Sequence, residues 1–409
     1  MPPDPNKPGT KNLKHIVVLM MENRPFDHML GALQSQDARI DGLAGTESNP
    51  DTTGEPVTVE PTADFLGQLD PDPDHSFPAV DLQIYGPVNG ALQTGENRVA
   101  NMQGFVRSYY NQQRNVQQSH KILYYFTADK LPVLTTLATE FALFTRWFAA
   151  IPGPTICNRA FAHYGTSFGQ VDMNVFYVNK QIKSIYERLI ATNPAHTAKL
   201  YYYDEASSTM EVVNLLQSQP QLFGTFDQFK SDCAAGVLPD YSFIEPNYTN
   251  HDTETGEAVA NDQHPDHDVR AGEQFIADVY NHIRGNPDLW SSTAMLIVYD
   301  EHGGIYDHVP PPACLPDGFV AQPASTGTPD AFHFDRLGVR VPAILVSPWV
   351  AKGTVISDRV FEHASIPATV TDFFIGSYDA RTDREKAANT FLDLLSLDTM
   401  RDDCPEFQF

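Results

Sequence analysis

Continuous apolar runs alternate along this chain with segments in which apolar residues recur every three to four positions. The runs predict buried strands at His15–Met21, Phe141–Phe148, Lys199–Tyr203, Tyr241–Glu245, Ala294–Tyr299 and Val341–Val346. The periodic segments predict helices at Phe105–Tyr125, Leu131–Glu140, Thr155–Tyr164, Ser184–Thr192, Thr225–Ala234 and from Val269 to the Gly285 and Pro287 stop. This alternation predicts an α/β fold with a mostly parallel central sheet flanked by helices.

The region between the first predicted strand and the Thr155 helix is long and irregular. Asp41–Asp81 is rich in Pro, Gly, Asp and Thr, which favours long loops. We therefore expect a loop-rich insertion, forming a cap, within about residues 41–150. No internal repeat or interdomain linker is visible, so residues 1–409 are predicted to form one domain.

The charge balance restricts the partners of the chain. Its 409 residues include 52 acidic and 27 basic ones, which gives a formal net charge of −25. Such a field repels nucleic acid and anionic membrane surfaces at long range, so we expect no nucleic-acid partner. A polyanionic substrate would need local neutralisation by a metal cation or by buried cationic side chains.

Three features bear on the cellular compartment. No apolar run approaches the roughly 20 residues that span a bilayer, so no integral membrane segment is predicted. Met1–Leu13 lacks the apolar region of a signal peptide, so we expect a cytoplasmic protein, or a secreted or periplasmic one whose leader was removed. The cysteines are far apart, form no CxxC pair and are predicted to be free thiols; they are Cys157, Cys233, Cys314 and Cys404.

Polar clusters follow three of the predicted strands. They are Glu22–Arg24, Glu245–Asn247 and Asp300–His302. If the strands are parallel, these clusters lie at the same sheet edge, where ligands of α/β proteins bind. Carboxylates that close together are tolerated when they are protonated or hold a cation, and a hard divalent metal would suit them. The alternative is that they are solvated loop carboxylates.

A second candidate element is a rigid turn that leads into a helix. Ile151–Pro154 breaks the preceding strand and delivers Thr155 to the first turn of the next helix. Helix N-termini stabilise anions, so an attacking Thr155 alkoxide and a phosphate or sulfate would both be favoured there. The alternative is that Thr155 is only an N-cap. Arg159 follows Cys157 too closely for a phosphatase cradle, so Cys157 is interpreted as a packing residue.

Histidines in loops bracketed by aspartates form a third candidate element. A carboxylate neighbour raises the pKa of an imidazole and fixes its tautomer, so such histidines can serve as acids or as metal ligands. The candidates are His75, His264, His267, His302 and His308. His264 and His267 have the spacing of a metal pair, although the same spacing is common in loops without function.

Together these segments resemble a known family. The segments that carry the resemblance are HIVVLMMENRPFDHMLG (His15–Gly31), DPDHSF (Asp72–Phe77), PGPTICNR (Pro152–Arg159), HPDHDVRAGEQFI (His264–Ile276), DEHGGIYDHVPPP (Asp300–Pro312), FDRLGVRVPAILVSPW (Phe334–Trp349) and FEHASI (Phe361–Ile366). In this order they resemble the phosphoesterase family that contains bacterial phospholipases C, acid phosphatases and plant non-specific phospholipases C. The resemblance implies an alkaline-phosphatase-like three-layer sandwich and metal-dependent hydrolysis of phosphoesters through a hydroxyl nucleophile.

The same resemblance assigns the centre of the site. It implies metal ligands at Glu22 and Asn23 of the ENR segment and at Asp300 and Glu301 of the DEHGG segment. It implies a nucleophile at Thr155, which we also count among the metal ligands. The oxygen-rich set suits one divalent ion such as Ca²⁺, Mg²⁺ or Mn²⁺, and a histidine ligand would favour Zn²⁺ or Fe.

Further residues are assigned around this centre. By resemblance, His75 and His264 contact the phosphate or serve the leaving group. A supporting or substrate-binding role is expected for Asn158, Arg159, His267, His302 and Asn247. Many secreted members of the family carry an export signal, which this sequence lacks, and the residues after Ile366 are too few for an extra C-terminal domain.

The function predicted from the sequence is a metal-dependent phosphoester hydrolase with a phosphothreonine intermediate at Thr155. It would act as a phospholipase C on phospholipid headgroups or as an acid phosphatase on small phosphoesters, and the acidic charge favours zwitterionic headgroups or soluble esters. The aromatic segments Phe105–Tyr110 and Tyr124–Phe126 would be a lipid-facing rim or part of the core. Alternatives are a sulfatase and a catalytically silent binding protein on the same fold.

Overall fold

The structure is a computed structural model that describes residues 6–95, 97–173, 182–204, 219–253 and 256–408. In this part of the chain the largest sheet has eight strands in the order β13-β4-β12-β11-β1-β8-β6-β7. Their bounds are β1 (His15–Met21), β4 (Ala142–Phe144), β6 (Ala198–Tyr202), β7 (Phe223–Thr225), β8 (Tyr241–Ile244), β11 (Thr293–Tyr299), β12 (Ala343–Val346) and β13 (Thr354–Ile356). Only β12 is antiparallel to its neighbours among these strands, so the sheet is mostly parallel, as predicted.

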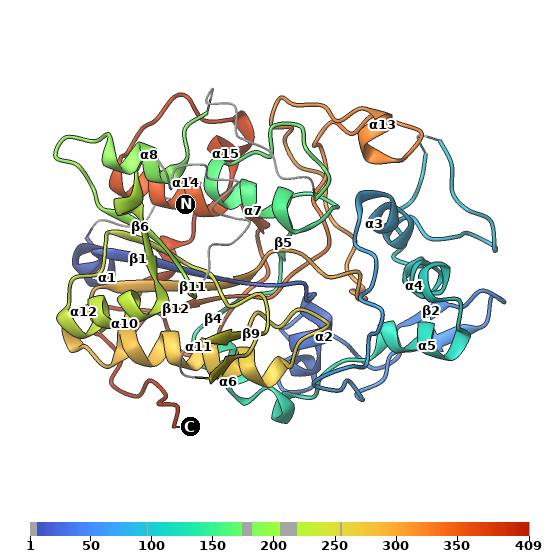
Figure 1. The fold of residues 1–409 in the computed structure, drawn as a ribbon, viewed down its shortest axis with the longest axis horizontal. Coiled ribbons are helices and arrows are strands. Elements are labelled where there is room, and N and C mark those ends of the chain that lie inside the picture. Colours follow the sequence, from blue (N-terminus) through green and yellow to red (C-terminus); the bar gives the residue numbers. More distant parts are fainter. Residues whose placement is uncertain (1–5, 96, 174–181, 205–218, 254–255, 409) are drawn as a thin grey trace.

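Helices cover both faces of this sheet (Figure 1). One layer contains α7 (Thr155–Tyr164), α8 (Ile185–Ile190), α14 (Ser365–Phe374) and α15 (Asp383–Ala387), and the other contains α6 (Pro132–Glu140), α10 (Phe226–Ala235), α11 (Val269–Arg284) and α12 (Pro287–Trp290). The three layers confirm the predicted α/β sandwich. No helix in the described ranges is both long and apolar enough to span a bilayer. All four cysteines are free thiols, as expected.

The two central strands fix the position of the strand-end clusters. β1 and β11 pair in parallel register from His15 with Thr293 to Met21 with Tyr299. Both strands are buried on both faces, which explains their uninterrupted apolar sequences. Because the paired strands end at the same level, the clusters that start at Glu22 and Asp300 begin side by side.

Part of the region between β1 and β4 forms a lobe with its own apolar core. The elements of this lobe are β2 (Ser48–Pro50), β3 (Pro56–Thr58), α3 (Phe77–Ile84), α4 (Phe105–Gln113) and α5 (Val116–His120), whereas α2 (Phe26–Leu30) precedes it and packs in the main core. Apolar side chains of residues 43–123, which we call the insertion lobe, pack together and against Ile305, Tyr306 and Val339. Figure 1 shows α3, α4 and α5 beyond one end of the central sheet. We propose that the insertion lobe is the cap expected from the sequence.

The single helix predicted over Phe105–Tyr125 is wrong. Arg114 adopts a left-handed φ of 59° and ends α4, and the Asn115 side chain then caps α5 by accepting a bond from the backbone of Gln118. Apolar residues on both sides of this break pack in one core, Phe105, Val106 and Tyr109 before it and Ile122 and Leu123 after α5. Asn115 was the local signal that marks a new helix start.

One other element also differs from the expectation. The strand predicted over Phe141–Phe148 is divided into β4 of the large sheet and β5 (Trp147–Phe148), which pairs with β14 (Phe361–Glu362). The segment Asn247–Asp268 contains the short antiparallel strands β9 (His251–Thr253) and β10 (Gly256–Ala258). The remaining elements are α1 (Pro8–Asn12), α13 (Pro323–Thr326) and the 3₁₀ turns Gly31–Ser35, Lys121–Leu123, Ala128–Lys130, Pro220–Leu222 and Leu392–Leu394.

Candidate active site

The strand-end clusters of β1 and β11 meet at the carboxyl edge of the sheet. The Asp300 backbone N–H donates to the Met21 carbonyl at 3.1 Å, and the Asn23 N–H donates to Asp300 Oδ1 at 3.0 Å. Asn23 has a left-handed φ of 52°, and a side chain at Gly303 would place its Cβ 2.2 Å from the Asn23 carbonyl oxygen. A glycine is therefore required where the two clusters pack together.

Arg159 of α7 is the counter-charge for these carboxylates. Its Nε donates to Asp300 Oδ2 at 3.1 Å, one terminal nitrogen donates to Glu22 Oε1 at 3.0 Å, and the other lies 4.0 Å from Glu245. The side chain is completely buried, so it supports the carboxylates and is shielded from solvent. Part of the neutralisation that the sequence assigned to a metal is thus provided by Arg159.

The remaining oxygen donors fit a hard divalent cation. Glu301 Oε2 accepts a bond from the Gly303 N–H at 2.7 Å, whereas the buried Glu301 Oε1 has no hydrogen-bond partner among the described residues. Burial and the neighbouring Asp300 raise the pKa of Glu22 well above its usual value, and burial raises that of Asp300 to about 6. An unpartnered oxygen beside carboxylates that are costly to ionise is a donor set that a cation would stabilise.

Two compact groups of acidic and histidine side chains lie outside this set. In the described ranges, the groups whose ligand atoms all lie within 4.8 Å are Asp27–Asp307–His308 and Asp72–His264–Asp266. The first is an internal ion network, because Arg340 bonds Asp27 at 2.8 Å and lies 3.2 Å from Asp307. This placement separates His308 from the predicted catalytic histidines. The second group lies beside His75.

Thr155 is the first residue of α7, and Pro154 holds the N-cap position. The interpretation of Thr155 as only an N-cap is therefore wrong. Its Oγ1 donates to Asn23 Oδ1 at 3.3 Å, which brings the predicted nucleophile to the predicted ligands. Asn158 braces the preceding turn, because its side chain accepts from the Ile151 N–H at 3.0 Å and donates to the Pro154 carbonyl at 3.2 Å.

Cys157 lies on the same helix but is not exposed to the site. Its side chain is fully buried, and Sγ donates to the Asp172 carbonyl. Burial raises the pKa of the Cys157 thiol well above its usual value, so the group stays protonated. This placement agrees with the interpretation of Cys157 as a packing residue.

His75 lies next to the nucleophile and the ligands. Its Nδ1 donates to the Pro73 carbonyl at 2.8 Å, and its Nε2 lies 3.4 Å from the Asn23 amide nitrogen and 3.9 Å from Glu301 Oε1. Burial opposes protonation, but Glu301 and Asp72 outweigh it and raise the pKa of His75 to about 9.

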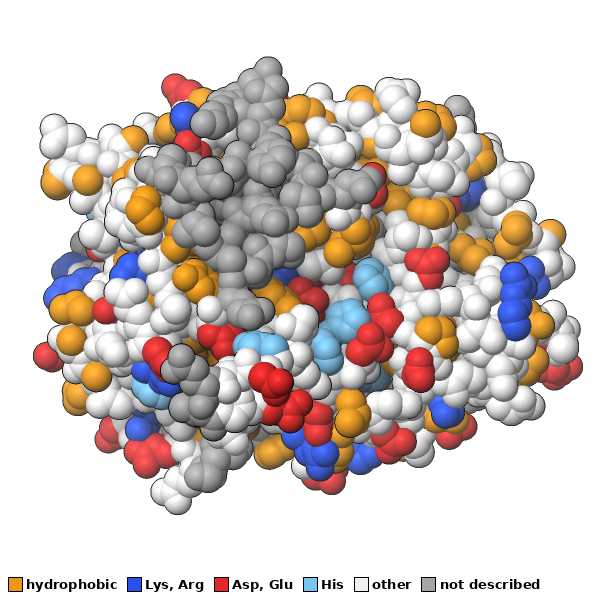
Figure 2. All heavy atoms as spheres, viewed as in Figure 1, with side chains coloured by type: hydrophobic (Ala, Val, Ile, Leu, Met, Phe, Trp, Pro, Cys, Tyr) orange, Lys and Arg blue, Asp and Glu red, His pale blue; other side chains and the backbone are white. Residues whose placement is uncertain are grey.

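His264 lies beyond His75 on a different loop. The two rings are 6.4 Å apart, and His264 Nε2 is 3.7 Å from Asp72 Oδ2. Burial lowers the pKa of His264 to about 4, although Asp262 and Asp266 partly offset this effect. The ring of His267 follows at 5.6 Å, and its Nδ1 donates to Asp262 Oδ1 at 2.7 Å. Figure 2 shows histidine and acidic side chains gathered in this way near the centre of one face.

Two other predicted residues, His302 and Asn247, make their hydrogen bonds to groups outside the central set of carboxylates. His302 donates from Nε2 to Gln83 Oε1 at 2.8 Å and lies 3.4 Å from Glu301 Oε2, so it connects the insertion lobe to Glu301. Asn247 donates from its side chain to the Val259 carbonyl at 3.0 Å. Asn247 therefore stabilises the conformation of its own loop.

His363 is a supporting residue that the sequence reasoning did not assign. Its Nε2 lies 2.5 Å from the Asp300 carbonyl, and the Trp147 indole nitrogen lies 3.3 Å from its Nδ1. Because an indole N–H can only donate, Nδ1 accepts and Nε2 carries the proton that bonds Asp300. Burial lowers the pKa of His363 to about 4, which keeps this neutral form. Its position in the FEHASI segment was the available signal.

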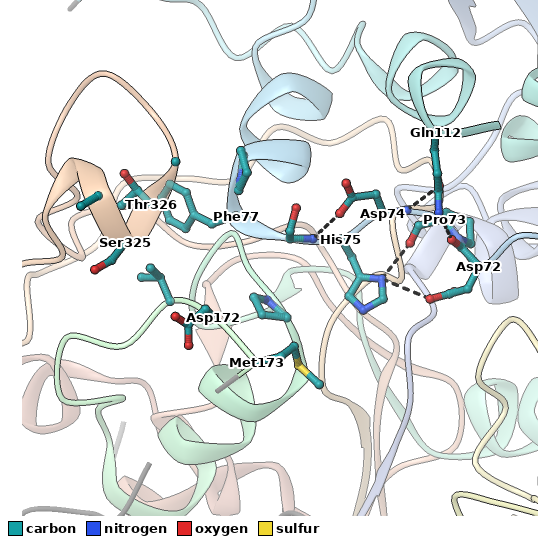
Figure 3. A pocket seen from close by; sticks show the side chains of 16 residues that line it. Asp72, Pro73, Asp74, His75, Phe77, Gln112, Asp172, Met173, Ser325 and Thr326 are labelled. Atoms are coloured by element: carbon teal, nitrogen blue, oxygen red, sulfur yellow. Dashed lines mark hydrogen bonds and ion pairs between the residues drawn. The ribbon is translucent and has the colours of Figure 1, made fainter. Parts of the chain in front are cut away.

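A pocket of about 480 Å³ opens beside His75. Figure 3 shows Asp72, Asp74 and His75 on one side of it and Asp172, Met173, Ser325 and Thr326 on the other. Pro154 also lines it, so the pocket reaches the turn that precedes Thr155. Its described lining contains three aspartates, at positions 72, 74 and 172, and no Lys or Arg. The pocket therefore favours a neutral or cationic group next to the site.

Comparisons with known proteins agree with this architecture. The phosphoesterase family model matches residues 13–375. The chain is 38% identical over 410 residues to non-specific phospholipase C6 of Arabidopsis thaliana, covering 96% of this chain and 74% of that protein. It is 26% identical over 401 residues to phospholipase C B of Mycobacterium tuberculosis, covering 87% and 72%.

Two solved structures show more distant likeness. The lipoteichoic acid synthase LtaP from Listeria monocytogenes superposes with a TM-score of 0.43 at 11% identity, over 97% of this chain and 79% of that one. A protein in the alkaline phosphatase superfamily from Vibrio parahaemolyticus has a TM-score of 0.35 at 11% identity, over 59% and 60%.

The fold, the family match and the relatives define a hydrolase of phosphoester bonds with a mixed α/β fold. The chain belongs to the phosphoesterase family.

Proposed function

We propose that this protein is a metal-dependent phospholipase C or acid phosphatase that forms a phosphothreonine at Thr155. The observation that carries the proposal is the bond from Thr155 Oγ1 to Asn23 Oδ1, at the edge where Glu22, Asp300 and Glu301 converge. A hydroxyl at the start of a ten-residue helix, beside a buried oxygen donor set, suits attack on a tetrahedral anion.

The donor set would hold one divalent cation. Glu22, Asn23, Asp300 and Glu301 with Thr155 offer only oxygen ligands, which favours Ca²⁺, Mg²⁺ or Mn²⁺ over Zn²⁺ or Fe. When bound, the cation would supply positive charge that stabilises the Thr155 alkoxide and a phosphoryl oxygen.

The chemistry then proceeds in two displacements at phosphorus. Thr155 releases its hydroxyl proton to solvent water and bonds to phosphorus as the bond to the leaving alcohol breaks, which forms a phosphothreonine. Water attacks the same phosphorus in the second displacement and releases the Thr155 alkoxide, which takes a proton back from solvent water. The free N–H groups at the start of α7 and the His75 ring stabilise the phosphoryl oxygens.

We assign proton transfer with the leaving group to His264. His75 faces the ligand side, with its Nε2 3.9 Å from Glu301 Oε1, so it contacts the phosphoryl group rather than the leaving group. His264 stands farther along, between Asp72 and Asp266, where it can protonate the departing alkoxide and later accept the proton of the attacking water. The negative charge of a bound phosphate raises the pKa of His264, so that His264 becomes protonated and can act as the acid.

The pocket supports a substrate whose group next to the phosphate is neutral or cationic. Its aspartates repel a second anionic group, whereas a choline-type headgroup or a simple alcohol is accepted. The names of the relatives, plant non-specific phospholipases C and a bacterial phospholipase C, favour a phospholipid headgroup.

Hydrolysis of a p-nitrophenyl phosphomonoester beside p-nitrophenyl phosphocholine tests this function, with metal-loaded and chelator-treated protein. Phosphocholine release indicates the phospholipase C activity, and monoester turnover indicates the acid phosphatase activity. We expect Thr155→Ala to lose on the order of 10³-fold or more in turnover while the fold is unchanged, whereas Thr155→Ser retains activity. Turnover by Thr155→Ala would contradict the nucleophile, and turnover after complete metal removal would contradict metal dependence.

A further inference from the structure

Arg24 directs its guanidinium at the loop that carries His264. The side chain is 3% exposed, although it directly follows the ligands Glu22 and Asn23. Its Nε donates to the Gln263 carbonyl at 2.6 Å, and one terminal nitrogen donates to the His264 carbonyl at 3.2 Å. The planar guanidinium of Arg24 thus binds two consecutive backbone carbonyls of one loop.

The third nitrogen of the Arg24 guanidinium is anchored away from the His264 loop, at His28 of α2. The other terminal nitrogen of Arg24 lies 3.0 Å from His28 Nε2, and His28 Nδ1 lies 2.7 Å from the Tyr124 carbonyl. A carbonyl oxygen can only accept, so His28 Nδ1 carries the proton and Nε2 accepts from Arg24. All three arms of Arg24 are engaged in bonds to protein groups.

The loop itself has a conformation that needs support. Gln263 is fully buried with a left-handed φ of 67°, which is costly for a residue with a side chain. Its amide accepts a bond from the Tyr299 hydroxyl and donates to the Val269 carbonyl at 3.0 Å. Without these bonds the backbone would relax towards ordinary dihedral angles, and the His264 ring would move with it.

We propose that Arg24 is a positioning residue for leaving-group protonation, because it holds the Gln263–His264 backbone so that His264 faces the departing alcohol. The inference rests on the proposed role of His264. A residue that acts in this way does not touch the substrate, and its bonds depend on the planar fork of arginine. Lysine keeps the charge but has one nitrogen, so it cannot replace three divergent bonds.

The test compares two esters that differ only in the leaving group. A p-nitrophenyl phosphodiester releases a stable anion and needs little help from an acid, whereas the matching alkyl ester needs a proton. For Arg24→Lys we expect kcat on the alkyl ester to fall about 10²-fold, while kcat on the p-nitrophenyl ester changes little. His264→Ala should show the same leaving-group dependence with a larger loss.

Two further variants keep the test decisive. Tyr299→Phe removes the hydroxyl bond to Gln263 and so loosens the same loop without changing Arg24. We expect it to show the same leaving-group dependence of kcat with a smaller loss. If Arg24→Lys does not fold, this variant tests whether the conformation of the loop positions His264. Arg401→Lys alters another guanidinium that bonds a backbone carbonyl, that of Glu140, far along the chain from the His264 loop, and it should affect both esters equally.

Each alternative result has a defined meaning. Equal losses on both esters in Arg24→Lys, a rise in KM alone, or unchanged kinetics would overturn the positioning role. Absence of leaving-group dependence in His264→Ala would overturn the acid assignment in the proposed function, and the inference about Arg24 would fall with it. Loss of activity in Thr155→Ala together with leaving-group dependence in His264→Ala confirms the proposed function independently of Arg24.

Discussion

Glu301 shows how burial can make a single carboxylate a binding group. One of its oxygens accepts a backbone bond, and the other is buried without a hydrogen-bond partner in the described part of the chain. An unsatisfied charged oxygen is costly, and a bound cation would remove that cost.

We therefore expect Glu301→Gln to weaken divalent-metal binding by at least about 10-fold, with a parallel loss of hydrolysis. Metal content after dialysis against a series of buffered metal concentrations measures the effect. Glu55→Gln, a change at an exposed loop carboxylate, is the matched control and should bind metal as the parent does. Equal metal affinity in Glu301→Gln and the parent would remove Glu301 from the ligand set.

At this scale the sequence could predict which residues gather, but it could not predict how they are oriented. Glu22 and Asp300 were predictable because each follows a strand whose apolar run is plain, and parallel register brings the strand ends together. The bridging position of Arg159 and the bond of His363 to Asp300 depend on contacts between segments far apart in the chain. Local pattern carries no information about such side-chain directions.

Between elements, Glu273 of α11 caps the start of α6. Its carboxylate accepts bonds from the backbone N–H groups of Val133 at 2.7 Å and Leu134 at 3.2 Å, two of the donors that a helix leaves free. Glu273→Ala would leave both donors buried and unsatisfied. We expect a loss of about 1–3 kcal/mol in the free energy of unfolding. The urea midpoint measures it, and Glu273→Gln, which keeps an acceptor, should lose less.

The same side chain should make stability depend on pH. Burial raises the pKa of Glu273 to about 7 from its usual 4.5, although the two backbone bonds oppose this shift. The folded protein thus binds this proton more tightly than the unfolded chain does. The stabilising contribution of the Glu273 proton to the free energy of unfolding is fully present below about pH 4.5. It is lost as the pH rises through 7, and the loss reaches about 3 kcal/mol. The urea midpoint of the parent should therefore fall relative to that of Glu273→Gln between pH 5 and pH 8. If the urea midpoints of the parent and of Glu273→Gln change equally from pH 5 to pH 8, Glu273 is ionised in the folded protein throughout this range.

The prediction of elements succeeded for strands with an uninterrupted apolar sequence. It failed where helical spacing of apolar residues continues from one helix into the next. β1 and β11 were recognisable because strands buried on both faces are uniformly apolar. The break between α4 and α5 was hidden because the apolar spacing runs on through Arg114, and only backbone geometry ends the first helix. A left-handed arginine has no sequence pattern of its own.

For the whole molecule, the order of strands and helices predicted the sandwich, whereas the core of the insertion lobe could not be predicted. Residues 43–123 close their apolar cluster against Ile305, Tyr306 and Val339, which come far later in the chain. The Pro- and Gly-rich composition of this region indicates loops correctly, but it does not show which distant residues cover them. His302 and Gln83 connect the lobe to the site at 2.8 Å.

The net charge of −25 leads to a prediction about lipid surfaces. A strongly acidic protein is repelled by anionic vesicles over a distance of about 30 Å at 0.01 M salt but only about 8 Å at 0.15 M. We expect hydrolysis of phosphatidylglycerol vesicles to rise several-fold over this range of NaCl, because screening weakens the repulsion. Hydrolysis of phosphatidylcholine vesicles and of soluble p-nitrophenyl phosphocholine should change little, since neither carries net charge. Initial rates on the three substrates at both salt concentrations measure this. A rate on anionic vesicles that falls with salt would mean that a local basic surface outweighs the overall charge at the membrane-facing side.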